Sequence, residues 1–204
     1  MADALLGMLG TPEEPHVQIL GMYNVLEGLG RMGRIDDGIA IIDRFFGALI
    51  DRGAVTWWEN FIADRPNRYS DSFSHAWGGS PTWFLSTYAL GAQRTGPTTW
   101  QVRYQPSQLR TMVGRLPLNS AVLMVQWQIE PCRQRTLTLN APFGHTGEII
   151  LPEVSQTNEL RLNGTVIWQN GQIQSESRLR VNDNQFILSL GSGEYTLGAD
   201  VRCP

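Results

Sequence analysis

Apolar residues in the first part of the chain recur at steps of three and four positions. From about Pro15 to Met32 this spacing predicts a helix with one buried face. After Gly33 a second helix is expected, with acidic residues at its start and Gly53 at its end. Its apolar face consists of Ile39, Ile42, Phe45, Phe46, Leu49 and Ile50. A third helix is predicted over 80–90, so the first 95 residues read as a helical segment.

Beyond a loop at 94–97 the hydrophobic period changes from 3.6 to 2. Apolar and polar residues alternate over 123–129 and again over 136–139, as they do in half-buried strands. Asn163-Gly164 lies between two such runs and is a strong hairpin signal. Many short strands at close spacing predict an antiparallel β-sandwich. The expected fold class is therefore α+β, with helices over 1–95, a sandwich over 96–204 and a boundary near Gly96.

Composition and charge exclude several function classes. The 204 residues are 42% hydrophobic with a formal net charge of -3, which is typical of a globular protein without a basic surface for nucleic acid. No apolar run approaches the roughly 20 residues of a membrane span. All 16 basic residues are arginine, so Schiff-base chemistry on a lysine is excluded. We expect no partnership with nucleic acid or membrane, and the opening residues carry no basic start of a secretion signal, which leaves the compartment open.

Cofactor and metal sites are not indicated by the sequence either. Two cysteines and scattered histidines do not form a zinc constellation, and no glycine-rich phosphate loop is present, so we expect neither metal nor cofactor. Cys132 and Cys203 either form a bridge or remain two separate thiols.

The candidate chemistry gathers in two short stretches, 53–59 and 72–84. They contain four of the chain's seven tryptophans, together with Glu59 and His75, one of only three histidines. Aromatic side chains beside a carboxylate are a common way of holding a sugar ring, and apolar neighbours raise the pKa of a carboxyl towards a catalytic range. Glu59 is therefore the first candidate catalytic residue.

Each of these residues also has a purely structural interpretation. Glu59 could instead pair with Arg65 or Arg68. His75 either orients a substrate hydroxyl or a carboxylate, or is a hydrogen-bonded structural histidine. Three of the tryptophans are either stacking platforms for a ligand or core residues, namely Trp57, Trp58 and Trp77.

The order of three segments, 23–33, 53–59 and 74–78, resembles bacterial-type α-L-rhamnosidases of glycoside hydrolase family 78. Gly114-Arg115-Leu116-Pro117, leading into the strand through Trp127, resembles the start of that family's C-terminal β-domain. The resemblance covers nearly the whole chain. It implies the last helices of an (α/α)6 barrel followed by the C-terminal sandwich.

By this resemblance, Glu59 corresponds to the family's general base, which takes a proton from the water that attacks the anomeric carbon. His75 corresponds to a histidine of the sugar pocket, and Trp58 and Trp77 to its aromatic walls. In inverting glycosidases the base and the general acid stand roughly 6.5–9.5 Å apart to leave room for that water.

The family's general acid lies in an upstream part of the barrel that this chain lacks. Glu13, Glu14 and Glu27 do not resemble it, and loss of one positioned proton transfer costs about 10²–10⁴-fold in rate. The incomplete barrel predicts apolar faces in need of cover, namely those of Phe45, Phe46 and Leu49. We therefore expect a homo-oligomer or a partner chain over the helical face.

Three functions follow as hypotheses. The chain is an α-L-rhamnosidase-like protein that carries the base half of the site and acts on a rhamnose-containing glycoside with another chain. Alternatively, the scaffold performs other acid/base chemistry on a small apolar molecule, or it is a non-catalytic module for carbohydrate binding or assembly.

Overall fold

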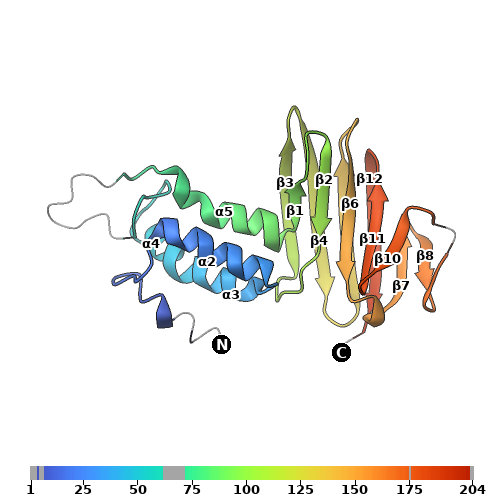
Figure 1. Ribbon diagram of the computed structural model, residues 1–204, viewed down its shortest axis with the longest axis horizontal. Coiled ribbons are helices and arrows are strands. Elements are labelled where there is room, and N and C mark those ends of the chain that lie inside the picture. Colours follow the sequence, from blue (N-terminus) through green and yellow to red (C-terminus); the bar gives the residue numbers. More distant parts are fainter. Residues whose placement is uncertain (1–3, 5–6, 62–71, 175, 203–204) are drawn as a thin grey trace. The chain divides into compact units, whose positions relative to one another are not determined.

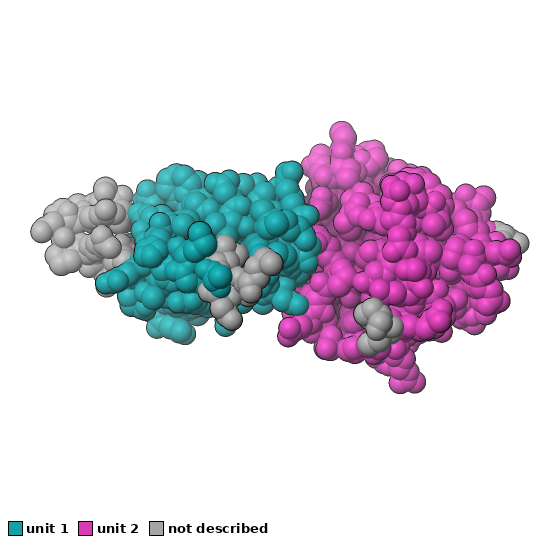
Figure 2. Space-filling model, turned by 60° about the horizontal axis from the view of Figure 1, so that its bottom comes forward, with its two compact units in different colours: residues 1–85 teal, residues 86–204 magenta. Residues whose placement is uncertain are grey.

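Residues 4, 7–61, 72–174 and 176–202 are the part of the chain that the computed structural model describes. The chain divides into two compact units, 1–85 and 86–204, coloured teal and magenta in Figure 2. The residue near which the sequence places a boundary, Gly96, belongs to the second unit. The first unit contains helices and the second contains two sheets, which confirms the α+β class with a β-sandwich.

The first unit contains the helices that the 3.6-residue pattern predicts (Figure 1). The first expected helix begins at Ile19 rather than Pro15, and the second runs without a break from Ile35 to Asp51 through one π-helical turn. The third expected helix is also partly π-helical, and it crosses into the second unit. The helical elements are α2 (Ile19–Arg31), α3 (Ile35–Ile41), η1 (Ile42–Phe46), α4 (Gly47–Asp51), η2 (Ala76–Gly79), α5 (Ser80–Phe84) and η3 (Leu85–Ala89).

The core of the first unit lies between these helices and is rich in phenylalanine. Phe45, Phe46 and Leu49 of the second helix are 0%, 1% and 2% exposed, so these three side chains are fully covered. Both phenylalanine rings pack against Phe61, with centroids 5.5 and 5.2 Å apart. The expectation that these three side chains need another chain to cover them is therefore wrong. The chain between 52 and 61 folds back and supplies the cover itself.

The second unit is a sandwich of two sheets with one core between them. The five-stranded sheet has the order β1-β2-β6-β11-β10, and the seven-stranded sheet has the order β3-β4-β5-β12-β7-β8-β9. All described ladders are antiparallel except that between β2 and β6. The strands are β1 (Ala92–Arg94), β2 (Thr99–Arg103), β3 (Thr111–Leu118), β4 (Ala121–Glu130), β5 (Gln134–Ala141), β6 (Thr146–Pro152), β7 (Thr157–Leu162), β8 (Thr165–Gln169), β9 (Gln172–Ile173), β10 (Leu179–Asn182), β11 (Gln185–Leu190) and β12 (Gly193–Val201).

Alternation along the strands places one set of side chains in this core. Trp127 of β4 and Trp100 of β2 are each 1% exposed, and they come from different sheets. Trp168 of β8 meets Phe186 of β11 edge to face across the sandwich, with centroids 5.0 Å apart. The polar positions of the same strands therefore face outward, away from this core.

The turn signal that Asn163-Gly164 provides in the sequence is confirmed. Asn163 and Gly164 have φ angles of 49° and 82°, and they connect β7 to β8. Asn170-Gly171 does the same between β8 and β9. Two successive residues with positive φ are the requirement of a type I′ turn, which asparagine and glycine satisfy at low cost.

Among the described residues, no helix is long and apolar enough to cross a membrane. Cys203, one of the two cysteines considered for a bridge, lies outside the described residues.

Candidate functional site

The candidate site is built on two extended segments of the first unit that pair with each other. The backbone N–H of Glu59 donates to the carbonyl oxygen of Ser72 at 2.8 Å, and the N–H of His75 donates to the carbonyl oxygen of Trp57 at 2.7 Å. The Thr56 hydroxyl adds a hydrogen bond to a carbonyl oxygen of the second segment. Residues 53–61 and 72–75 therefore lie side by side, and the predicted acid and histidine are brought together.

The Glu59 carboxylate is fixed through one of its two oxygens. Its Oε2 accepts the backbone N–H of Ser72 at 2.8 Å and lies 3.7 Å from Nδ1 of His75. That second distance is too long for a hydrogen bond but suits an ion pair when the histidine is protonated. Oε1 has no hydrogen bond within the described part of the chain. The carboxylate thus has a fixed orientation and one oxygen available, while 22% of the side chain is exposed.

Trp77 fixes both of these residues. Its indole Nε1–H donates to the backbone carbonyl oxygen of Glu59 at 3.1 Å. Its ring also stacks on the His75 imidazole, with centroids 3.8 Å apart and planes inclined by 32°. Trp77 nevertheless stays 37% exposed, so part of the ring is available to a ligand. Glu59, His75 and Trp77 form one cluster.

The other two predicted tryptophans have different surroundings. Trp58 is half-buried and meets Phe73 edge to face, with centroids 5.0 Å apart. Trp57 contacts Phe46 and lines an apolar pocket of about 290 Å³ beside α4. Neither Glu59 nor His75 lines that pocket. Trp57 lines this apolar pocket, while its backbone carbonyl oxygen accepts the N–H of His75.

Gly78 is a residue of the site that the sequence patterns did not single out. A Cβ atom at this position would lie 2.6 Å from Cβ of Trp57 and 2.9 Å from the carbonyl oxygen of Trp58. The turn η2 therefore rests directly on the backbone that precedes Glu59, and only glycine allows this approach. Gly78 has no positive φ angle that would require a glycine. The need for glycine at this position therefore follows only from the close contact in the folded structure.

This arrangement suits a base that acts on water or on a hydroxyl group. Glu59 is the only acidic residue in 53–61 and 72–79, so a second carboxylate is not provided by these segments. Arg65 and Arg68, the alternative partners of Glu59, lie outside the described residues. Among the residues that are described, no group of three or more histidine, cysteine, aspartate or glutamate side chains is placed to hold a metal ion.

No protein-family model matches the chain, and no curated protein matches its sequence. Solved structures do match its fold. An α-L-rhamnosidase from Dictyoglumus thermophilum superposes with a TM-score of 0.72 and 18% sequence identity, over 89% of this chain and 21% of that one. The chain thus spans about a fifth of the length of that enzyme. At this identity the similarity establishes the fold alone, which resembles that part of the rhamnosidase.

Two other carbohydrate-active enzymes match more weakly. A family 31 dextranase of Flavobacterium johnsoniae in complex with isomaltotriose has a TM-score of 0.35 and 7% identity, over 50% of this chain and 16% of that one. A family 127 β-L-arabinofuranosidase from Geobacillus stearothermophilus also has a TM-score of 0.35, with 12% identity, over 63% of this chain and 20% of that one.

Proposed function

We propose that this chain carries the general-base half of an inverting glycoside hydrolase site for α-L-rhamnosides, and that another chain supplies the general acid. The observation that carries the proposal is the Glu59 carboxylate. One oxygen is held by the Ser72 N–H, the other is available, and the stacked His75 and Trp77 rings stand beside it. The rhamnosidase-like fold supports the same function.

In this mechanism Glu59 accepts a proton from a water molecule. The resulting hydroxide-like oxygen forms a bond to the anomeric carbon on the face opposite the leaving group, whose bond to that carbon breaks. The configuration at the anomeric carbon is inverted. His75 holds a sugar hydroxyl or steadies the Glu59 carboxylate, and the exposed part of Trp77 lies against the apolar face of the sugar.

A site that has the general base but lacks the general acid should hydrolyse only glycosides whose leaving group departs without a proton. An alkoxide leaving group needs a proton from the missing acid, and its absence costs about 10²–10⁴-fold. A 2,4-dinitrophenolate leaves without a proton. The purified chain should therefore hydrolyse 2,4-dinitrophenyl α-L-rhamnoside, and it should show no measurable turnover of methyl α-L-rhamnoside.

The test compares both substrates with the parent chain, Glu59→Gln and the control Glu14→Gln. Glu14 is an exposed glutamate whose carboxylate has no hydrogen bond in the described part of the chain. We expect loss of dinitrophenyl rhamnoside turnover in Glu59→Gln only, and β-L-rhamnose as the first product by NMR. Equal rates for Glu59→Gln and the parent would exclude Glu59 as the base. Efficient cleavage of the methyl glycoside would place an acid within this chain and contradict the half-site.

A second candidate function is a non-catalytic sugar-binding module, and the exposed Trp77 ring is the observation that favours it. Calorimetry with L-rhamnose separates the two. Binding of the sugar that Trp77→Ala abolishes, with no turnover of the dinitrophenyl glycoside by the parent chain, would overturn the catalytic assignment in favour of binding.

We further propose that a second copy or a partner chain contacts the first unit. Leu20, Met32, Ile50 and Val55 are 52%, 64%, 64% and 95% exposed, and the last two line the apolar pocket beside Trp57. Light scattering on the purified chain should give a mass above that of a monomer, or a monomer that gains mass when its partner is added. A strict monomer in the presence of cell extract would contradict this proposal.

A further inference from the structure

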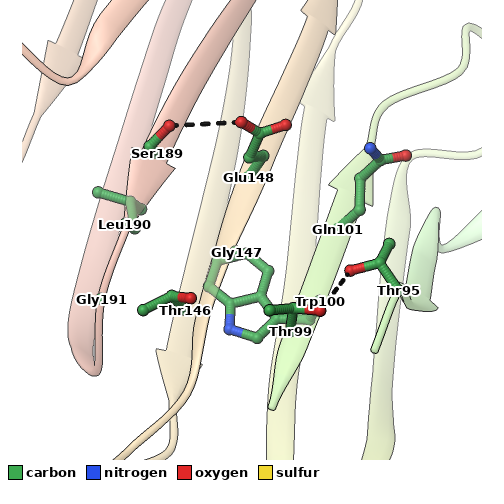
Figure 3. Close-up of a pocket in the computed structure, with 10 residues that line it drawn as sticks. All are labelled: Thr95, Thr99, Trp100, Gln101, Thr146, Gly147, Glu148, Ser189, Leu190 and Gly191. Atoms are coloured by element: carbon green, nitrogen blue, oxygen red, sulfur yellow. Dashed lines mark hydrogen bonds between the residues drawn. The ribbon is translucent and has the colours of Figure 1, made fainter. Parts of the chain in front are cut away.

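The second unit has a pocket of about 620 Å³ on the outer face of its five-stranded sheet, and polar side chains line part of it (Figure 3). This volume lies in the range of about 300–1,000 Å³ that is typical of small-molecule sites. Strands β2, β6 and β11 form the floor, and Thr95 closes one side. The pocket is contained in the second unit and shares no residue with the Glu59 cluster.

The strand register arranges the polar side chains of this pocket in two rows. Gln101 and Ser189 are both register partners of Glu148, one from each neighbouring strand. In the next row Thr99 is the partner of Thr146. Neighbouring strands are about 4.8 Å apart, so each row presents polar groups at a spacing comparable with the width of a sugar ring.

Glu148 lies at the centre of the first row. Its Oε1 accepts hydrogen bonds from Nη2 of Arg180 at 2.7 Å and from the Ser189 hydroxyl at 3.4 Å. Its Oε2 has no partner among the described residues, and 35% of the side chain is exposed. As at Glu59, one oxygen is fixed and the other is available. Figure 3 shows the two oxygens pointing in different directions, one towards Ser189 and one away from it.

The neighbouring side chains retain hydrogen-bonding capacity as well. The Gln101 amide and the Thr146 hydroxyl have no hydrogen bond within the described residues. The Thr99 hydroxyl accepts from Thr95 at 3.0 Å, which leaves its own proton free to donate. Carboxylate, amide and hydroxyl groups therefore offer both donors and acceptors to a ligand.

The charges in the pocket exclude other ligand classes. Glu148 is the only charged residue that lines it, so an anion such as phosphate would meet a carboxylate and no lysine or arginine of the lining. A metal ion would find a single carboxylate that already pairs with Arg180. An apolar ligand would leave the amide and hydroxyl groups without partners, which is costly.

Two strands of the pocket floor, β2 and β6, are in close contact. Trp100 of β2 packs in the core under Gly147 of β6, where an added Cβ would lie 2.2 Å from Cδ2 of the indole. The two strands are thus held together by a close contact as well as by their parallel ladder. A site on such strands keeps its geometry better than a site on loops, which favours recognition by several directed hydrogen bonds.

We infer that this face of the second unit is a binding site for a neutral saccharide, with Glu148 as the central acceptor and Gln101, Thr99 and Thr146 as its neighbours. A sugar hydroxyl donates to Oε2 of Glu148 while it accepts from an adjacent amide or hydroxyl. This site is distinct from the proposed Glu59 site, and it holds a carbohydrate without acting on it.

The inference is tested with the full chain by ¹⁵N NMR titration. The probes are methyl α-L-rhamnopyranoside, methyl β-D-glucopyranoside and methyl β-D-galactopyranoside, with inorganic phosphate as the anionic comparison. We expect at least one glycoside to shift the backbone amide signals of Gln101, Glu148 and Ser189, and phosphate to leave them unchanged. Because signals are assigned by residue, shifts here are separate from shifts at Glu59 and His75, so the two proposals can fail independently.

Variants then assign the contacts. Glu148→Gln removes one charge-assisted hydrogen bond and should weaken binding at this pocket about tenfold or more. Gln101→Ala should also weaken it, and its amide makes no hydrogen bond within the described residues on which folding would depend. The matched control is Glu194→Gln on the other sheet, where Glu194 bonds Asn140 at 3.1 Å. Unchanged affinity in both pocket variants, or no shift at these amides with any of the three glycosides, would overturn the inference.

Discussion

The close contact at Gly78 allows a quantitative test of how the candidate site is held together. Ordinary van der Waals contact begins at 3.4 Å, whereas a Cβ at this position would lie 2.6 Å from Cβ of Trp57 and 2.9 Å from the carbonyl oxygen of Trp58. In Gly78→Ala the two segments must therefore separate by roughly 0.5–0.8 Å, because neither contacted atom belongs to the end of a flexible side chain. Such overpacking costs about 1–3 kcal/mol.

The displacement acts on function as well as on stability. Glu59 directly follows the two tryptophans that must move, and His75 is bonded to the backbone of Trp57. Binding and catalytic groups need to be placed to within about 0.5 Å. We therefore expect Gly78→Ala to lose affinity for L-rhamnose and turnover of the dinitrophenyl glycoside along with stability.

Urea denaturation followed by the NMR indole signals of Trp57 and Trp77 measures the free energy of unfolding of the first unit alone. For a unit of 85 residues, each kcal/mol corresponds to roughly 4–8 °C in melting temperature. The matched control is Gly28→Ala in α2, where nothing lies within 4 Å of the added Cβ. This change should stabilise the unit by about 0.5–1 kcal/mol through helix propensity. A Gly78→Ala variant as stable as the parent would refute the close contact.

Three further predictions concern the second unit. Gly147→Ala should lower its free energy of unfolding by about 1–3 kcal/mol, because the new Cβ would meet the Trp100 ring at 2.2 Å; an unchanged urea midpoint would contradict this. Gly164→Ala meets no atom within 4 Å but has a φ of +82°, so its cost of about 1–2 kcal/mol should come from the backbone alone, and Gly164→Asn should recover part of it in the same assay. The side-chain hydrogen bonds from Arg178 hold the pKa of the Glu176 carboxyl below its ordinary value. The stability that the ionised Glu176 carboxylate contributes is present above the unfolded-state pKa of about 4.3 and is lost as the pH falls through the folded-state pKa. In thermal melts Glu176→Gln should therefore lose less stability than the parent on acidification. Equal losses would disprove the coupling.

The elements that could be predicted from the sequence are those specified by local patterns. Helix α2 follows from apolar spacing, and the hairpin at Asn163-Gly164 follows from residues that tolerate positive φ. Local patterns do not show what lies opposite an apolar face. The burial of Phe45 and Phe46 depends on Phe61, which comes from a segment without helical periodicity. The parallel ladder between β2 and β6 likewise joins segments far apart in the chain, and neither carries a turn signal for it.

The candidate residues of the first site could be identified from the sequence, but their arrangement could not. Glu59 and His75 stand close together because residues 57–59 pair with 72–75, a contact that no periodicity encodes. Trp57 was expected at the same site, and only the folded chain shows that its ring contacts Phe46 and lines an apolar pocket beside α4. Glu148 was not singled out because an outward polar residue in an alternating strand resembles any other. Only the strand register shows that it has Gln101 and Ser189 beside it.

The position of β12 has a consequence for how the second unit folds during synthesis. This strand follows all others of its sheet in the chain, yet it lies in the interior of the sheet, between β5 and β7. Until Gly193–Val201 has left the ribosome, β3-β4-β5 and β7-β8-β9 are two separate pieces with unpaired edges. Folding of the sandwich must therefore wait for its last strand, and a stalled or truncated product would expose two edges prone to association.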